Sequence, residues 1–230
     1  MDETRITRKA SLARVGGILA AAAGAGAWVG TGKAASVGPA AVASGEIACV
    51  LSPELTEGPY YVAGAKVRRN ITGGKPGTPL TLHLGVADIS SCKAITGAAV
   101  DVWHADAGGV YSDEQVENTV GQTFLRGIQK TAKSGIATFQ TIYPGLYRGR
   151  AVHIHVKVHL GGTVVHTGQL FFDDGLTDAV YRKAPYSARP DRDTLNAADS
   201  IYRNGGSRSV LRLAKDGSGY AGTIWMGVHA

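Results

Sequence analysis

A His-x-His pair at residues 153 and 155 is the feature of the sequence with the clearest chemical meaning. It ends the stretch YPGLYRGRAVHIH, residues 143–155, which also holds two tyrosines and two arginines. In a β-strand, residues i and i+2 face the same side, so His153 and His155 present two imidazoles together. Because neutral imidazole is a common metal ligand, the pair predicts a metal site. A lone pair on an open, solvated sheet face is the alternative.

The remaining ligands of such a site need not be imidazoles, because the other five histidines form no second spaced cluster. Zinc usually recruits Cys, Asp or Glu, and none follows the pair within HIHVKVHLGG. Tyr147 lies six residues before His153, after a Pro-Gly turn, and Tyr111 follows a Gly-Gly pair. Phenolate is a hard oxygen ligand that suits a highly charged ion such as Fe(III). For each tyrosine the alternative is a half-buried ring with a hydrogen-bonded hydroxyl.

The elements that must position these residues are expected to be strands. After about residue 46, short apolar runs alternate with Gly, Pro, Asp and Asn, and no long helical period occurs. The pattern predicts an all-β fold with a β-sandwich core, long loops and few short helices. Residues 174–204 are expected to form a long excursion with one or two short helical turns. The candidate strands are 79–87, 98–104, 136–140, 151–158, 164–172, 208–213 and 219–228.

The charge distribution argues against a nucleic-acid partner. The formal net charge is +6, but residues 1–43 carry five basic and two acidic residues, which is +3 of that total. Downstream, the basic residues are scattered among acids and form no run of five or more. Nucleic-acid binding proteins instead gather their Lys and Arg residues on one surface. No nucleic-acid partner is therefore expected.

The first 43 residues are expected to be an export signal peptide of the bacterial type. A charged start precedes an Ala- and Gly-rich run at 15–30, which is shorter than the roughly 20 residues of a membrane span. We therefore expect cleavage after Ala41-Val42-Ala43, no permanent membrane span, and a mature catalytic domain at 44–230 outside the cytoplasm. Thr7-Arg8-Lys9 resembles a twin-arginine signal with Lys in place of the second Arg. A buried Ala-rich helix is the alternative.

Both cysteines of the chain, Cys49 and Cys92, follow the expected cleavage site. An even number of cysteines in an exported protein favours a disulfide bond. The sequence therefore predicts a Cys49–Cys92 disulfide, with two free buried thiols as the alternative.

Four stretches occur in the order and character of the intradiol ring-cleavage dioxygenases, especially their short secreted group. They are LSPELTEGPYYV, GAAVDVWHADAGGVYS, YPGLYRGRAVHIHVKV and GQLFFDD, and the resemblance runs from about residue 49 to 228. It implies an oxidoreductase with one non-haem Fe(III) per chain. Such an enzyme cleaves a catechol-type ring between its hydroxyl groups with O2, inserts both oxygen atoms and gives a muconate-type dicarboxylic acid. The implied partners are a small aromatic diol and O2, and the oligomeric state stays open.

The resemblance also assigns roles to individual residues. The four iron ligands of the family match Tyr111, Tyr147, His153 and His155. The six-residue gap between Tyr147 and His153 is shorter than in the larger catechol dioxygenases, which places the chain with the compact secreted group.

The remaining site residues also follow from the resemblance. Arg150 matches a catalytic arginine three residues before the first ligand histidine. Gln169 matches a glutamine that lines the substrate pocket, with a catalytic role in orienting the ring or the peroxide. Tyr147 would also act as a base. Pro59 and Tyr60 belong to a loop, 57–61, that borders the catechol ring. Two alternatives remain from the residues alone: a secreted, non-catalytic β-sandwich binding module, and a His-x-His copper or zinc protein.

Overall fold

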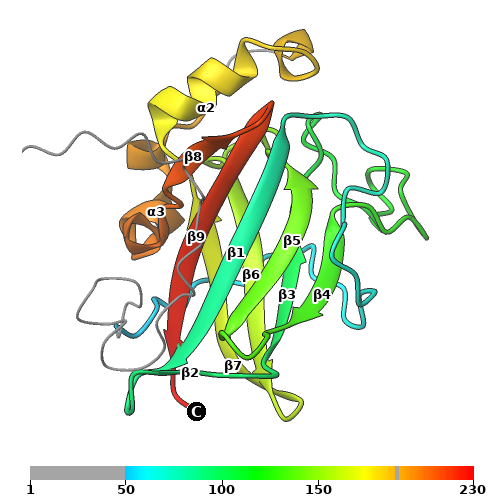
Figure 1. The fold of residues 1–230 in the computed structure, drawn as a ribbon. Helices are drawn as coiled ribbons and strands as arrows, with labels where there is room; N and C mark the ends of the chain where they lie inside the picture. The colour runs from blue at the N-terminus through cyan, green and yellow to red at the C-terminus, as the bar shows by residue number, and fades with distance from the viewer. Residues whose placement is uncertain (1–49, 190–191) are drawn as a thin grey trace, which may run out of the picture. The chain divides into compact units, whose positions relative to one another are not determined.

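The structure is a computed structural model that describes residues 50–189 and 192–230. Within these ranges the chain forms two β-sheets that face each other (Figure 1), so the predicted all-β sandwich is confirmed. No helix in this part of the chain is long and apolar enough to cross a membrane. Residues 1–43 and Cys49 lie outside the described residues. The signal peptide, its cleavage and the Cys49–Cys92 disulfide therefore stay predictions.

The first sheet is built around strand β1 (Pro79–Asp88). β1 pairs antiparallel with β5 (Ile136–Ile142) and with the short β2 (Lys93–Ala94). It also pairs in parallel with β9 (Gly219–Val228), which forms an antiparallel hairpin with β8 (Leu213–Asp216).

The second sheet is antiparallel throughout and carries the predicted metal ligands. Its order is β4 (Arg126–Lys130), β3 (Ala99–Trp103), β6 (His153–Leu160) and β7 (Thr163–Phe171). In this register Trp103 on β3 and Gln169 on β7 are the direct cross-strand partners of His155. Directly opposed residues on neighbouring strands lie within side-chain contact, so the register places all three side chains together.

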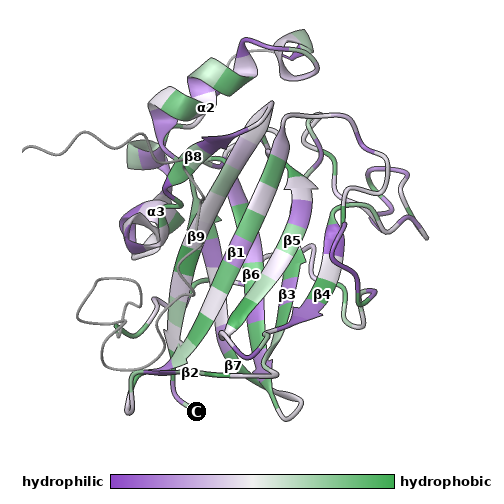
Figure 2. Ribbon diagram, in the orientation of Figure 1, coloured by the Kyte–Doolittle hydropathy of each residue, from purple (hydrophilic) through white to green (hydrophobic). Residues whose placement is uncertain are grey.

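The hydrophobic core lies between the two sheets. It takes alternate residues of strands such as β1 and β6, and Figure 2 shows hydrophobic and paler positions alternating along β1. On β6 the core residues are Ile154, Val156 and Val158, all fully buried. Because neighbouring residues of a strand point to opposite faces, His153 and His155 lie on the outer face of the sheet. They are nevertheless buried, because loops cover that face.

Six of the seven predicted strands are present, and the strands β2, β4 and β8 were not predicted. The segment 208–213 was predicted as a strand but contains the end of a 3-10 turn, η3 (Gly206–Ser209), and the nearby strand β8 begins only at Leu213. Its apolar side chains are used differently: Leu211 is buried, and its N–H donates to the Phe171 carbonyl oxygen. β4 was missed because its sequence, RGIQK, is mostly polar.

The excursion after β7 holds more helix than predicted. It contains α2 (Asp174–Tyr181), α3 (Ser200–Arg203), and the 3-10 turns η1 (Tyr186–Ala188) and η2 (Asn196–Ala198). Asp173 caps α2 by accepting the Leu176 N–H, and Asp199 caps α3 in the same way. Such caps satisfy the free N–H groups of a helix start, which explains why these short helices form here.

Candidate active site

The two histidines of the His-x-His pair converge. Their Nε2 atoms lie 3.0 Å apart, and both side chains are buried. Nδ1 of His153 lies 2.7 Å from the Ala151 carbonyl oxygen; because a carbonyl only accepts, Nδ1 donates and Nε2 keeps its lone pair. Burial lowers the pKa of His153 to about 4 and the pKa of His155 well below its usual value. Both rings are therefore neutral at pH 7, as metal ligands must be.

His155 is oriented by packing. Nδ1 of His155 has no hydrogen-bond partner in the described part of the chain. One face of its ring stacks on Trp103, with centroids 4.9 Å apart and an interplanar angle of 9°. Gly58 also approaches this ring: a Cβ at Gly58 would lie 3.1 Å from Cε1 of His155. The 57–61 loop thus covers His155.

The two predicted tyrosine ligands lie beside the histidines. Tyr111 is buried, and its ring centroid is 5.7 Å from that of Tyr147 and 6.2 Å from that of His155. The structure therefore brings the four residues of the predicted ligand set into one cluster. Tyr60 joins them: its ring stacks on Tyr111 at 4.5 Å, and its hydroxyl lies 2.6 Å from the Tyr147 hydroxyl.

The loops that carry Tyr111 and Tyr147 meet at Asp106. The Asp106 backbone carbonyl accepts the N–H groups of Gly109 and Gly145, which belong to different loops. A side chain at Gly109, where φ is +80°, would collide with the Leu146 carbonyl oxygen, and one at Gly145 would collide with the Asp106 backbone. Glycine at these two positions thus allows the close approach of the loops.

Arg126, from strand β4, joins the Tyr111 loop to the Tyr60 loop. Its side chain is buried, and Nη2 donates to the Ser112 carbonyl oxygen at 2.6 Å. Nε donates to the Ser112 hydroxyl at 2.9 Å, and Nη1 donates to the Tyr60 carbonyl oxygen. One guanidinium group therefore fixes the backbone next to Tyr111 and at Tyr60.

Arg150 and Gln169 are in contact, as a shared site requires. Nη2 of Arg150 donates to Oε1 of Gln169 at 2.7 Å, and Nε donates to Oδ2 of Asp199 at 2.7 Å. The fully buried Gln169 also donates to the Thr56 carbonyl oxygen at 2.8 Å. Although burial favours the protonated acid, hydrogen bonds from Arg150 and two backbone N–H groups hold the pKa of Asp199 below its usual value. Pro59 is exposed, at the turn that carries Tyr60.

The donor set of this cluster fits a ferric ion. The described ranges hold no group of three or more His, Cys, Asp or Glu side chains that could bind a metal, so a site here must use other donors. Burial raises the pKa of Tyr111 well above its usual value, so its phenol stays protonated unless a strong cation lies beside it. Two neutral imidazoles and two phenol oxygens are suitable donors for such a cation.

Sequence reasoning missed three residues of this site: Trp103, Arg126 and Asp199. Trp103 and Asp101 lie two residues apart on a predicted strand and therefore share a face of the sheet. That this face carries His155 could have been inferred once the pairing of β3 with β6 was known. Asp199 precedes Ser-Ile-Tyr-Arg, a recognisable helix start, but its contact with Arg150 spans 49 residues. Arg126 lies on the polar strand that was not predicted.

The comparisons with known proteins agree with this architecture. A family model described as "Dioxygenase" matches residues 56–191, which is more than half of the chain. Together with the fold, this match defines the class of the protein as a β-sandwich dioxygenase. An intradiol ring-cleavage dioxygenase from Tetranychus urticae superposes with a TM-score of 0.73 and 34% identity, covering 79% of this chain and 95% of that chain. This chain belongs to the intradiol ring-cleavage dioxygenase family.

Other relatives show how far the likeness extends. The dioxygenase domain of a dioxygenase carbohydrate-binding protein fusion from Streptomyces sp. SirexAA-E has a TM-score of 0.61 and 31% identity, over 79% of this chain and 99% of that domain. Catechol 1,2-dioxygenase 1 from Acinetobacter lwoffii is 35% identical over 98 residues, which is 40% of this chain and 31% of that protein. The chain spans between 31% and 55% of the length of the curated relatives that it matches.

Proposed function

We propose that this chain is a non-haem Fe(III) dioxygenase that cleaves catechol-type rings between the two hydroxyl groups. The observation that carries the proposal is the convergence of the two imidazole Nε2 atoms, 3.0 Å apart, with the rings of Tyr111 and Tyr147. These four side chains would hold one iron per chain. When bound, the iron would favour the deprotonated diol and supply the redox chemistry that O2 requires.

The proposed reaction balances without an outside reductant. Both atoms of O2 enter the product, one on each of the two carbons that carried the hydroxyl groups, and the bond between these carbons breaks. The product is a muconate-type dicarboxylic acid.

Tyr147 would accept a substrate proton. A diol must lose protons to bind a metal through both oxygens, and a phenolate oxygen at Tyr147 can take one of them. The Tyr60 hydroxyl, 2.6 Å away, would hold that oxygen in place by a hydrogen bond in either protonation state. Tyr60 would therefore orient the base. Its loop would also place Tyr60, together with Pro59, beside the substrate ring.

Arg150 would stabilise negative charge on the substrate ring. Its guanidinium is fixed by Asp199 on one side and by Gln169 on the other, so it need not reorganise during the reaction. Preorganised donors of this kind contribute about 2 to 4 kcal/mol in other enzymes. Gln169 would orient Arg150 and line the pocket beside it.

Export of the protein is also proposed, on the signal-like residues 1–43 alone. An exported enzyme would meet its aromatic substrates outside the cytoplasm. The Cys49–Cys92 disulfide would be compatible with that location.

Oxygen uptake tests the proposal. We expect the iron-loaded protein to consume one O2 per catechol, protocatechuate or hydroxyquinol molecule, and mass spectrometry to find both oxygen atoms in a dicarboxylic acid. His153→Ala, which removes one proposed ligand, should consume none. Uptake with an aldehyde-containing product would contradict cleavage between the hydroxyls. No uptake with any of the three diols, or a preparation that binds only copper or zinc, would contradict the proposed activity.

A further inference from the structure

Lys157 is a buried cation close in sequence to the proposed metal ligands. It lies on β6 two residues after His155, so the two side chains share the outer face of the sheet. Only 6% of its side chain is exposed. A buried ammonium group needs partners, because burying a charge without them is costly. Its partners therefore indicate which part of the molecule it holds.

The partners of Lys157 lie at the two ends of the 57–61 loop. Its ammonium group forms an ion pair with the carboxylate of Glu57, at the start of the loop. The same Nζ lies 3.7 Å from the ring centroid of Tyr61, at the end of the loop. Such a cation–π contact is attractive, and it becomes stronger when the cation is shielded from water. One side chain thus holds both ends of the loop.

The 57–61 loop is held by side chains and not by backbone pairing. In the part of the chain that the structure describes, no hydrogen bond between backbone groups joins this loop to another segment. Inside the loop, the Tyr60 carbonyl oxygen accepts Nη1 of Arg126. The position of the loop therefore depends on a small number of side chains, and Lys157 contacts it at both ends.

Between its two ends, the loop contacts three of the four proposed iron ligands. A Cβ at Gly58 would lie 3.1 Å from Cε1 of His155. The ring of Tyr60 stacks on Tyr111 with centroids 4.5 Å apart, and its hydroxyl lies 2.6 Å from the Tyr147 hydroxyl. A shift of the loop would therefore change all of these contacts together.

We propose that Lys157 is a positioning residue: by holding both ends of the 57–61 loop, it keeps the Tyr60 hydroxyl in contact with the oxygen of Tyr147. This inference rests on the proposed function, in which Tyr147 would accept a substrate proton. Lys157 acts on that step only through the loop. The contact matters because a small misplacement of a catalytic group lowers the rate strongly.

Hydrogen exchange of the full iron-loaded chain, measured by mass spectrometry, tests the anchoring. Lys157→Met keeps an unbranched side chain and removes the charge. The variant should fold, because the Glu57 side chain is 42% exposed and water can solvate its carboxylate. We expect the N–H groups of the 57–61 loop to exchange about fivefold faster in Lys157→Met, and those of β5 to exchange at the wild-type rate.

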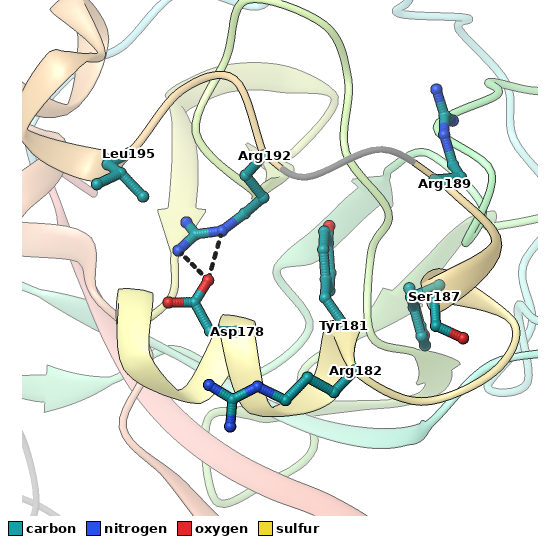
Figure 3. Close-up of a pocket in the computed structure, with 8 residues that line it drawn as sticks. Asp178, Tyr181, Arg182, Ser187, Arg189, Arg192 and Leu195 are labelled. Carbon is teal, nitrogen blue, oxygen red and sulfur yellow. Dashed lines mark hydrogen bonds and ion pairs between the residues drawn. The ribbon is translucent and has the colours of Figure 1, made fainter.

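Asp178→Asn is the matched control. It breaks another ion pair between a cation with a buried side chain, Arg192, and a carboxylate that water reaches, with Nη2 and Oδ1 2.7 Å apart. Figure 3 shows this pair in a cavity of about 390 Å³ beside α2, which none of the proposed active-site residues lines. We expect exchange of the 57–61 loop and kcat/KM to keep their wild-type values in this variant.

A double-mutant cycle with Tyr60→Phe tests whether Lys157 acts through the Tyr60 hydroxyl. In the wild-type background, Lys157→Met should lower kcat/KM for catechol about tenfold. In the Tyr60→Phe background the same change should cost at most about threefold, because the hydrogen bond to Tyr147 is already absent.

Three results would overturn the inference: unchanged exchange of the 57–61 loop in Lys157→Met, equal effects of Lys157→Met and Asp178→Asn, or equal losses of kcat/KM in both backgrounds. A wild-type protein that cleaves no diol would refute the proposed function. The exchange rates would still decide whether Lys157 anchors the loop, so the two failures are distinguishable.

Discussion

The carboxylate of Asp199 holds Arg150 and the backbone beside it at the same time. Oδ2 of Asp199 accepts Nε of Arg150 at 2.7 Å and the N–H of Ala151 at 2.8 Å, while Oδ1 accepts two N–H groups at the start of α3. Ala151 in turn orients His153 through its carbonyl oxygen. One buried acid on a distant loop thus fixes the guanidinium of Arg150, the proposed catalytic cation. It also fixes the backbone at Ala151, whose carbonyl oxygen orients His153, the first proposed histidine ligand.

Asp199→Ala should therefore reduce activity as well as stability. Loss of the anchor lets Arg150 move, and misplacement by about 1 Å can cost on the order of a hundredfold in rate. Asp173→Ala is the matched control, because Asp173 caps α2 in the same way but is not bonded to Arg150. Loss of either cap should cost about 1 kcal/mol of unfolding free energy. Equal kcat/KM values in the two variants would show that Asp199 acts only as a helix cap.

Gly58→Ala should weaken iron binding. A methyl group at Gly58 would press on His155 from 3.1 Å, and φ there is +74°, which costs an L-residue about 1 to 2 kcal/mol. Gly64→Ala separates the two effects, because φ is +78° and nothing lies within 4 Å of the added carbon. We expect similar losses of unfolding free energy in both variants, and a lower iron content only in Gly58→Ala. Iron retention by Gly58→Ala at the level of Gly64→Ala would show that the contact with His155 is unimportant.

Arg126→Gln should loosen two loops at once. It removes the fork that bonds the Ser112 and Tyr60 carbonyl oxygens, and we expect the unfolding free energy to fall by about 2 to 4 kcal/mol. Lys130→Gln, an exposed change on the same strand, is the control. Urea unfolding and iron content measure the two effects. An Arg126→Gln variant that unfolds like Lys130→Gln would contradict this role.

Asp101 should make stability depend on pH between about 4 and 7. Burial raises its pKa to about 7, and its cross-strand neighbour Lys157 pairs with Glu57 instead. Because the folded-state pKa lies above the unfolded value of about 3.9, the folded state binds the proton more tightly. The stabilising contribution is fully present below pH 4 and is lost as the pH rises through 7.

Asp101→Asn, which cannot ionise, should remove that dependence. The quantity to compare is the unfolding free energy of Asp101→Asn minus that of wild type. This difference should be larger at pH 8 than at pH 5 by up to a few kcal/mol. Urea denaturation at both pH values measures the difference. A variant-to-wild-type difference that is the same at both pH values would mean that Asp101 ionises normally in the folded protein.

The sequence allowed more of the fold than of the site to be predicted. Alternation identified six strands and placed His153 and His155 on one face, because strand geometry is local. It missed β4, whose sequence is mostly polar and whose Arg126 is buried, and it misread 208–213, where Leu211 is buried without belonging to a strand. Among nine tyrosines, the residue pattern could not select Tyr111 and Tyr147; only the family resemblance did. The Arg150–Asp199 contact depends on how a long excursion folds back, which no local pattern encodes.

The visible absorption spectrum of the iron-loaded protein tests the central proposal most directly. Phenolate bound to Fe(III) gives a red-brown colour by charge transfer, so Tyr111→Phe and Tyr147→Phe should each remove much of that band. Tyr220→Phe, a buried tyrosine on the first sheet, should leave it unchanged. A colourless iron-loaded wild type, or a Tyr147→Phe spectrum identical to that of wild type, would contradict a ferric site built from these side chains.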